Sequence, residues 1–383
     1  MKKRPAGPYL SQATGTAHAM ATVGAEVGVR GPDVPGIEPS ATSKRRAGWL
    51  GPLYSLQHVL HKHASLGPLL VLVLSAVVFE LLHQGFLHLE NISLMLQQLA
   101  VLGTLSIGQT MIMLTAGIDL SVGALMILAQ MIMGELAINA GVSPVLALVI
   151  GVAFGALMGF VNGALTARVR LPAFIVTLGT LGIYTAIGLR LSGGATLFFG
   201  GSALAGTSIS GSSNALLWTG TFLSAGSFTI TTGVLIMIGL YLVFAYVLAR
   251  TAWGRHVYAV GDDIEAARLA GIRVRSLITS VYMVAGVIYG FAAWVQIGRV
   301  GSVSPDISST LNLDSITAVV IGGTSLFGGR GVMMGTLFGA LIVQCFETGL
   351  QLIGVNALYL PLAEGVLVIA AVALDHWIRA IKD

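Results

Sequence analysis

The sequence predicts an all-α protein, a polytopic transmembrane helical bundle of about ten spans in which some helices are broken or re-entrant. Two features of its composition support this fold class. Of its 383 residues, 55% are hydrophobic and only 9% are charged, whereas charged residues make up about 25% of a soluble domain. Glycine occupies 50 positions. Small residues let helix backbones approach closely in lipid, where apolar side chains provide little attraction between helices.

Residues 1–63 are predicted to form a basic, disordered tail on the cytoplasmic side of the membrane. They contain eight Lys or Arg residues against three Asp or Glu residues, and they are rich in Ala, Gly and Pro without an apolar period. No apolar stretch follows Lys2-Lys3-Arg4 as a cleavable signal peptide requires. No aromatic residues interleave with the charges, so a nucleic acid partner is not expected. The positive-inside bias therefore places the tail in the cytoplasm.

Residues 64–383 form the predicted transmembrane domain. Crossing the hydrocarbon core takes about 20 apolar residues, and the sequence shows ten such stretches. They lie near residues 66–83, 94–115, 121–139, 145–166, 173–191, 229–249, 276–297, 314–328, 332–353 and 357–374. If the tail is in the cytoplasm, the number of crossings places residues 168–170, the loop 250–275 and the basic C-terminus in the cytoplasm as well, as the positive-inside bias expects. Arg190 and Arg299 are the exceptions, each near an outer end.

Two places in this series are expected to be irregular. The eighth stretch is short, because few residues separate Asp314 from the glycine run 328–331. The segment 117–121, Gly-Ile-Asp-Leu-Ser, is expected to interrupt the chain between the second and third stretches. Irregular backbone at membrane depth is tolerated where it is buried in protein or lines a cavity. On the opposite, outer side, the uncharged segment 192–227 is predicted to be a surface loop with a short helix around 214–218.

Residue types argue against an enzyme. A Walker A loop needs a lysine directly after its glycines, and none of the five lysines has that setting. The serine hydrolase pattern G-x-S-x-G is absent, and no histidine–carboxylate cluster has metal-ligand spacing. We therefore expect no catalytic residues, no metal and no cofactor bound by this chain. The lone Cys345 is interpreted as an apolar filler inside a helix.

Polar side chains inside the spans are candidates for a solute pathway, because each costs free energy in lipid and usually faces the bundle interior. Acidic residues are scarce among them, which argues against a cation-coupled pump and suits a neutral hydroxylated solute. For any single residue, helix–helix hydrogen bonding is an equally good explanation. The residues assigned to the pathway are Gln97, Gln109, Asp119, Asn162, Thr177, Gln296, Asn312, Asp314 and Glu347, while Gln98 and Gln344 are further polar residues within the spans.

The loop 250–275 is predicted to contain a short amphipathic helix over residues 262–272. Two aspartates can cap its start, an acidic residue occupies its first turn, and a glycine can end it. Such a helix can dock onto a partner protein, or it can lie at the lipid headgroups. The residues assigned to partner contact are Asp262, Asp263, Glu265, Ala267, Arg268, Leu269 and Gly271.

Four ordered motifs resemble the permeases of ribose-type ATP-binding-cassette (ABC) sugar importers. The first is Leu-Thr-Ala-Gly-Ile-Asp-Leu-Ser-Val-Gly at 114–123, and the second runs from Asn162-Gly163 through 171–180. The third comprises 253–255, 258–261 and 266–272 in the loop, and the fourth is 316–331. The resemblance extends from about residue 64 to residue 375.

The resemblance implies the permease subunit of a bacterial importer, located in the inner membrane with both chain ends in the cytoplasm. Such a subunit pairs with a second copy, contacts ATPase subunits that bind ATP and Mg²⁺, and receives a monosaccharide from a periplasmic sugar-binding protein. Where the family commonly has Gly-Gly-Asn, this chain has Gly261-Asp262-Asp263, and Asn312-Leu313-Asp314 replaces Glu-Leu-Asp. The second departure favours fructose or ribose over xylose. Two alternatives stay open: an ion-coupled secondary transporter of a small neutral solute, and a branched-chain amino-acid ABC permease.

Overall fold

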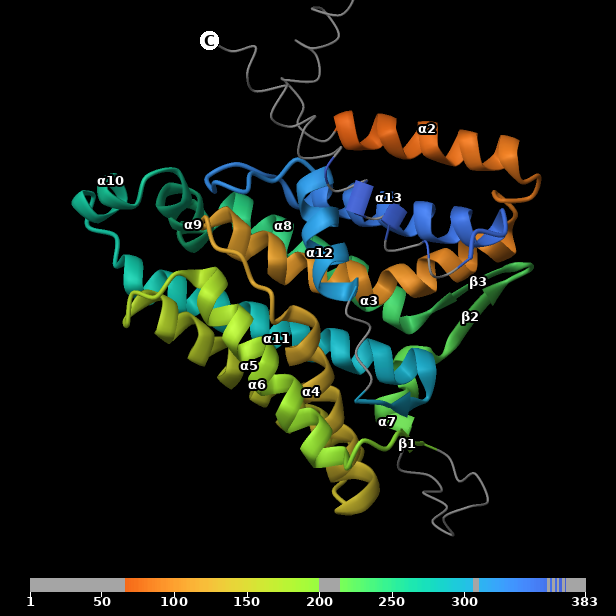
Figure 1. Cartoon of the computed structure of the whole chain (residues 1–383), viewed down its shortest axis with the longest axis horizontal. Coiled ribbons are helices and arrows are strands. Elements are labelled where there is room, and N and C mark those ends of the chain that lie inside the picture. The colour runs from red at the N-terminus through yellow and green to blue at the C-terminus, as the bar shows by residue number, and fades with distance from the viewer. Residues whose placement is uncertain are drawn as a thin grey trace, which may run out of the picture. The chain divides into compact units, whose positions relative to one another are not determined.

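The computed structural model describes residues 66–199, 214–305 and 310–356, and also 359, 362–363, 365–366 and 369. These residues belong to one compact unit, Leu53–Asp383. The predicted tail, 1–63, lies outside the described residues, and so does most of the tenth predicted span. The described part is helical with only a few short strands, which confirms the predicted fold class (Figure 1).

Nine of the predicted spans correspond in order to helices of the described part. Among them, seven are long and apolar enough to cross a membrane, counting α4 with its π-helical extension, whereas α2 and α12 are shorter. Their bounds are α2 Leu66–Leu82, α3 Leu89–Leu114, α4 Val122–Gly134 with its extension Glu135–Asn139, α5 Pro144–Ala167, α6 Ala173–Ser192, α8 Thr232–Arg250, α11 Val274–Val300, α12 Thr310–Ile321 and α13 Met333–Leu352.

Helix α11 packs against α5 at the centre of the bundle, and glycine makes the contact possible. A Cβ atom on Gly155 would lie 2.5 Å from the carbonyl oxygen of Gly286, and a Cβ on Gly286 would collide with the carbonyl oxygen of Gly155. One turn further along α5, a Cβ on Gly159 would collide with the carbonyl of Tyr282. The two backbones therefore touch directly, as expected for helices that pack in lipid through small residues.

The eighth predicted span is placed differently in the structure. Helix α12 starts at Thr310 and ends at Ile321, before the predicted boundary at residue 328. Gly323, Gly328 and Gly329 have φ angles of +85°, +84° and +70°, a left-handed backbone that a helix does not contain. The glycine run thus forms a loop, 322–332, instead of the end of a span. The predicted interruption near 117–121 is likewise non-helical, between α3 and α4.

The outer segment contains the predicted short helix, observed as α7 Asn214–Leu217 and a 3-10 turn, η2 Trp218–Gly220. Four strands were not predicted. β1 Leu197–Phe198 pairs with β4 Ser302–Val303, and β2 Phe222–Ala225 forms a hairpin with β3 Phe228–Thr231. Strands of two to four residues are too short to produce an alternating pattern in the sequence.

The loop 250–275 contains two helices where one was predicted. α9, Ala252–Asp262, precedes α10, Ile264–Leu269, and Asp263 separates them as the N-cap of α10. The start of α9 is capped by Thr251, whose hydroxyl oxygen accepts a hydrogen bond from the backbone N–H of Gly254 at 3.1 Å. The sequence prediction missed α9 because its residues are mixed in polarity and include two glycines.

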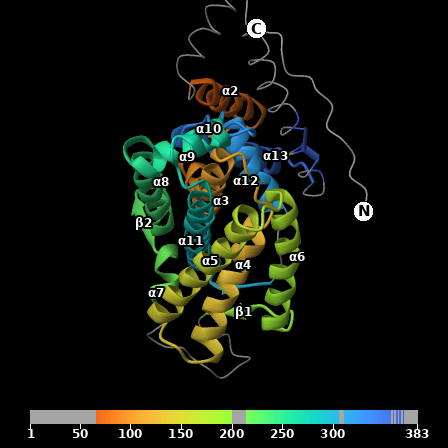
Figure 2. The same cartoon turned by 90° about the vertical axis from the view of Figure 1, so that its left-hand side faces the viewer.

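The connections gather on two sides of the bundle. The Gly329 N–H donates to the carbonyl of Leu114 at 3.0 Å, and the Tyr258 hydroxyl donates to the carbonyl of Gly331 at 2.9 Å. Both interruptions therefore lie beside α9. In Figure 1, α9 and α10 lie at the left and β2, β3, α7 and β1 at the right, and the turned view of Figure 2 also places α9 beside α10 and apart from α7 and β1. The ten-span prediction places successive connections alternately on the two sides of the membrane. Such a topology requires the connections to gather on two opposite sides of the bundle, as they do here (Figure 1).

Single-cysteine labelling tests this arrangement. In a background where Cys345, the one cysteine of the sequence, is replaced by Ala, we expect Leu269→Cys and Phe327→Cys to react with an impermeant maleimide only after cells are permeabilised. Phe222→Cys on β2 should react in intact cells. The three native side chains are 85%, 83% and 62% exposed in the isolated chain, so in cells that produce this chain without its partners the membrane limits access. Reaction of Leu269→Cys in intact cells would contradict the predicted topology.

Candidate functional site

A cavity of about 240 Å³ lies between α3, α11, α12 and α13, and we call it the polar cavity. Pockets for drug-sized ligands are typically about 300–1,000 Å³, so this one suits a smaller solute. Seven of the ten side chains that line it are polar or charged. The lining residues are Gln98, Val101, Leu102, Gln296, Arg299, Thr310, Leu311, Asp314, Gln344 and Glu347.

A chain of amide and carboxylate groups forms one wall of the polar cavity. Gln344, which is 2% exposed, donates from Nε2 to Oε1 of Gln98 at 2.6 Å and to Oε2 of Glu347 at 3.1 Å. From α11, the guanidinium Nε of Arg299 donates to Oε1 of Gln296 at 3.3 Å. The cavity thus presents donors and acceptors held in place by their neighbours. Hydroxyl groups both donate and accept, so this lining matches a polyhydroxylated solute.

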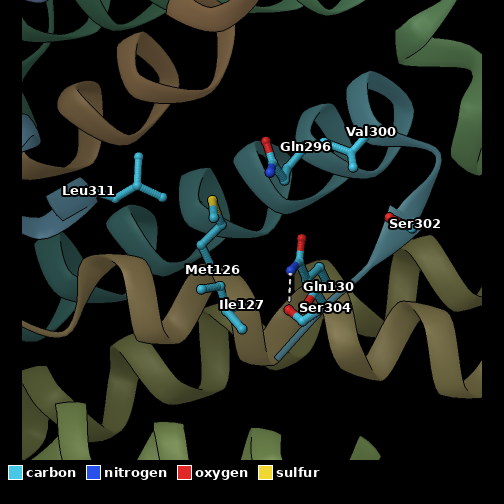
Figure 3. A pocket seen from close by; sticks show the side chains of 8 residues that line it. All are labelled: Met126, Ile127, Gln130, Gln296, Val300, Ser302, Ser304 and Leu311. Carbon is cyan, nitrogen blue, oxygen red and sulfur yellow. Dashed lines mark hydrogen bonds between the residues drawn. The ribbon is translucent and has the colours of Figure 1, made fainter. Parts of the chain in front are cut away.

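A smaller cavity of about 80 Å³ adjoins the polar cavity and shares Gln296 and Leu311 with it. Figure 3 shows its lining residues, Met126, Ile127, Gln130, Gln296, Val300, Ser302, Ser304 and Leu311. The amide Nε2 of Gln130 donates to the carbonyl of Ser304 at 3.0 Å. The smaller cavity is lined equally by polar and apolar side chains, and it extends from the polar cavity toward α4.

Three of the nine residues that the sequence assigned to the pathway line the polar cavity: Gln296, Asp314 and Glu347. The other six line neither cavity. Gln97 instead donates to the carbonyl of Thr229 at 3.4 Å, on the hairpin. Its neighbour Gln98 lies on the cavity, because adjacent helical residues point about 100° apart.

Four further polar residues line the cavity and were not among those assigned to the pathway from the sequence: Gln98, Arg299, Thr310 and Gln344. Polarity within a span was visible in the sequence for Gln344, and a charge near an outer end was visible for Arg299. No signal in the sequence showed which of the many polar residues converge.

Asp119, Asn162 and Thr177 belong to a second buried group, which closes the first interruption. Oδ1 of Asp119 accepts from the backbone N–H of Ser121 at 2.8 Å and from its hydroxyl at 2.6 Å. Nδ2 of Asn162 donates to the Ser121 hydroxyl oxygen at 2.9 Å, and Tyr184 donates to Oδ1 of Asn162 at 3.1 Å. The hydroxyl of Thr177 donates to the carbonyl of Ile118 at 3.1 Å. We call this group the Asp119 network, and its geometry is that of a structural clamp.

Asp119 lies between α3 and α4, outside the membrane-spanning helices, and is 1% exposed. Burial disfavours its charged form and raises the pKa of Asp119 to about 6, although the two hydrogen bonds from Ser121 act in the opposite direction. The nearest helix after it, α4, has Ser121 as its N-cap and no side-chain cap bond. Asp119 therefore stabilises the turn itself.

Asn312 links two helices that are far apart in the sequence. Its Oδ1 accepts from the backbone N–H of Gly123, the second residue of α4, at 2.7 Å. This bond satisfies one of the donors that the start of every helix leaves without an intrahelical partner. It also fixes α12 against α4, so Asn312 has a positioning role in the structure.

The residues assigned to partner contact divide into buried and exposed positions. Oδ1 of Asp263 accepts from the N–H groups of Glu265 and Ala266 at 2.8 and 3.0 Å, as predicted for a cap. Gly271, with φ +85°, follows the end of α10. Ala267 is 4% exposed and packs on the core, whereas Leu269 is 85% exposed. Leu269 is thus the most exposed apolar side chain of α10, beside Ile264 at 45% exposure, and the exposed pair Arg268–Glu265, 3.6 Å apart, lies on the same helix.

Comparison with known proteins places the chain among transport subunits. Residues 91–372 match a family described as "Branched-chain amino acid transport system / permease component". The chain is 47% identical over 330 residues to the fructose import permease protein FrcC of Rhizobium meliloti, with 86% of this chain and 90% of that protein covered. It is 34% identical over 311 residues to the ribose import permease protein RbsC of Bacillus subtilis, covering 81% and 92%.

A third relative is the autoinducer 2 import system permease protein LsrC of Photorhabdus luminescens, 33% identical over 309 residues, with 81% of this chain and 88% of that protein covered. No solved structure is significantly similar to the chain.

Substitution of Asp119 tests the clamp. Because the folded-state pKa of about 6 lies above the ordinary value of 3.8, the folded protein binds the proton more tightly, and wild-type stability should fall as pH rises between these values. Asp119→Asn keeps an oxygen acceptor and removes the titration. We expect it to retain fold and transport and to lose this component of the pH dependence of the melting temperature.

Asp119→Leu removes the acceptor and leaves the Ser121 donors unpaired, so it should lose both fold and transport. Thermal unfolding in detergent from pH 4 to pH 7 measures both variants. A harmless Asp119→Leu substitution would contradict the clamp.

Proposed function

Because the chain belongs to the permease family of ribose-type ABC importers, we propose that it forms the membrane pathway of an importer for a monosaccharide, with fructose as the first candidate. Its family membership makes it a transport subunit of an importer and not an enzyme. The observation that carries the proposal is the polar cavity between α3, α11, α12 and α13. Its size and mixed lining suit a small solute with many hydroxyl groups.

Sequence relationship supports fructose over ribose. The identity to the fructose permease is 47%, and the identity to the ribose permease is 34%. Asn312-Leu313-Asp314, whose departure from Glu-Leu-Asp favours fructose or ribose by resemblance, reaches the polar cavity through Asp314. A relative with autoinducer 2 in its name shows that the family is not restricted to sugars of one kind.

The energy source is proposed to be a partner ATPase. The chain has no Walker A lysine, so it cannot hold a nucleotide in that way. Helix α10 lies outside the membrane-spanning helices and presents Leu269, which suits docking on the inner side. A second copy of the chain, a periplasmic binding protein and a location in the bacterial inner membrane complete the proposed assembly.

Uptake of labelled solutes separates this proposal from its alternatives. Cells that produce the chain with its ATPase and binding protein should accumulate labelled fructose ahead of ribose and xylose. Depletion of ATP should stop uptake, while an ionophore that leaves ATP intact should not. Ionophore sensitivity with ATP intact would instead support a secondary transporter, and competition by leucine would support an amino-acid permease.

Glu347→Gln tests the polar cavity. The substitution keeps the shape of the side chain and removes the charge that accepts from Gln344 at 3.1 Å. In the proposed site, the carboxylate accepts from sugar hydroxyls more strongly than an amide does. A hydrogen bond to a charged group contributes about 1.5–3 kcal/mol against about 0.5–1.5 kcal/mol for a neutral one, so uptake at low sugar concentration should fall about tenfold. Glu90→Gln, on the exposed first turn of α3, is the matched control and should transport normally. Equal uptake by both variants would exclude Glu347 from the pathway.

Leu269→Glu tests docking through α10. Removal of an apolar side chain at the centre of an interface typically costs about 2 kcal/mol or more of binding free energy, whereas charged side chains at the rim of the interface contribute little. We expect Leu269→Glu to lower ATPase co-purification and sugar uptake together, whereas Arg273→Ala should have a small effect. A helix that lies at lipid headgroups predicts the reverse pattern, with lower membrane expression and unchanged ATPase association for each folded molecule.

A further inference from the structure

Three segments that are distant in the sequence meet at one point, which we call the glycine junction. They are the C-terminal end of α9, the residues that follow α3, and the loop 322–332 between α12 and α13. The Gly329 N–H donates to the carbonyl of Leu114 at 3.0 Å, and the Tyr258 hydroxyl donates to the carbonyl of Gly331 at 2.9 Å. The junction therefore binds α9 to both interruptions of the helical bundle.

Backbone atoms touch directly at this junction. A Cβ atom on Gly261 would collide with the carbonyl oxygen of Leu114 and lie 2.5 Å from the nitrogen of Gly329. A Cβ on Gly329 would lie 2.8 Å from the Cα of Asp262, and one on Gly328 would lie 2.7 Å from the carbonyl oxygen of Gly261. No side chain stands between the segments to absorb a relative displacement. Packed contacts of this kind transmit movement because they do not deform continuously.

The junction continues into the walls of the polar cavity. Loop 322–332 is closed by a hydrogen bond from the Ser325 N–H to the carbonyl of Arg330 at 2.8 Å. Beyond the loop, Gly322 and Gly335 bring α12 and α13 into backbone contact, since a Cβ on Gly322 would lie 2.5 Å from the carbonyl oxygen of Gly335. Helices α12 and α13 supply Thr310, Leu311, Asp314, Gln344 and Glu347 to the cavity, and α3 supplies Gln98.

The opposite wall of the cavity belongs to another tightly packed pair. Gln296 and Arg299 come from α11, which is in backbone contact with α5 through Gly155 and Gly286. The polar cavity therefore lies between two sets of helices, each joined by backbone contacts. One set, α3 with α12 and α13, is attached to α9 at the junction, and the other is α11 with α5. Helix α3 of the first set also packs on α11, but through a side chain, since a Cβ on Gly108 would lie 2.5 Å from the ring of Tyr289.

We infer that Gly261 is a positioning residue for energy coupling, which makes α9, α3 and the α12–α13 pair move as one body against α11 and α5 and so change the width of the polar cavity. The inference rests on the proposed function, because it takes the docked ATPase as the source of movement. The inference adds a structural route, through α9 and the glycine junction, by which movement of α10 reaches the side chains that line the polar cavity.

Gly261→Ala is the direct test. The methyl group must separate α9 from Leu114 or Gly329, while the exposed face of α10 remains as it was. We expect ATPase co-purification to stay at the wild-type level and sugar uptake to fall about tenfold or more. Gly239→Ala on α8 is the matched control, because a Cβ there would meet nothing within 4 Å, and it should transport like the wild type.

Spin-label distances test the inference even if Gly261→Ala folds poorly. In the Cys345→Ala background, the pair Arg255→Cys and Phe327→Cys spans α9 and the loop. Its distance should be the same with and without ATP in the assembled complex. The pair Val145→Cys and Ile353→Cys reports on α5 against α13 and should change with ATP. A change in the first pair, or an unchanged second pair, would overturn the inference.

Tyr258→Phe gives a second functional variant. It removes the hydroxyl that donates to the carbonyl of Gly331 and adds no bulk, so it should lower uptake less than Gly261→Ala does. The outcomes also separate the inference from the proposed function. If wild-type cells show no ATP-dependent uptake, the proposed function fails. If the wild type transports and Gly261→Ala transports equally well, the junction has no coupling role and the proposed function stands.

Discussion

Direct contact between backbones is the interaction on which this structure depends. Lipid removes most of the hydrophobic attraction between helices, so close approach has to provide van der Waals contact instead. Glycine provides it at the centre, between α5 and α11, and again where α12 meets α13. The same residue type then joins α9 to both interruptions. Many glycines in the described part of the chain therefore serve the packing of helices and not only the loops.

Polar groups in this bundle fall into two classes with different consequences. The Asp119 network bonds within itself and joins the start of α4 to α5 and α6, so it holds a turn in place. The residues of the polar cavity come from four helices and leave room between them for a solute. Both classes look alike in the sequence, as single polar residues among apolar ones. Only convergence in space distinguishes a clamp from a pathway.

The sequence predicted the fold class and the order of the nine helices because a span needs a long apolar run, and such runs are visible directly. It placed the end of α12 incorrectly because Gly322 and Gly323 are apolar enough to continue a span, although their backbone leaves the helix. Of the polar residues that line the cavity, its pathway candidates include Gln296, Asp314 and Glu347 but not Gln98, Arg299, Thr310 and Gln344. Which of two adjacent glutamines faces the cavity depends on helix rotation, and that is set by packing partners far away in the sequence.

Helix α12 has a consequence for the permeability barrier. Twelve residues of α-helix rise about 18 Å, while the hydrocarbon core of a bilayer is about 30 Å thick. Helix α12 alone is therefore too short to cross the bilayer, and neighbouring backbone has to complete the wall beside it. In the proposed transporter, the wall of the polar cavity that α12 forms is thus shorter than the membrane is thick, and the close glycine contacts of loop 322–332 would have to seal the remainder against ions.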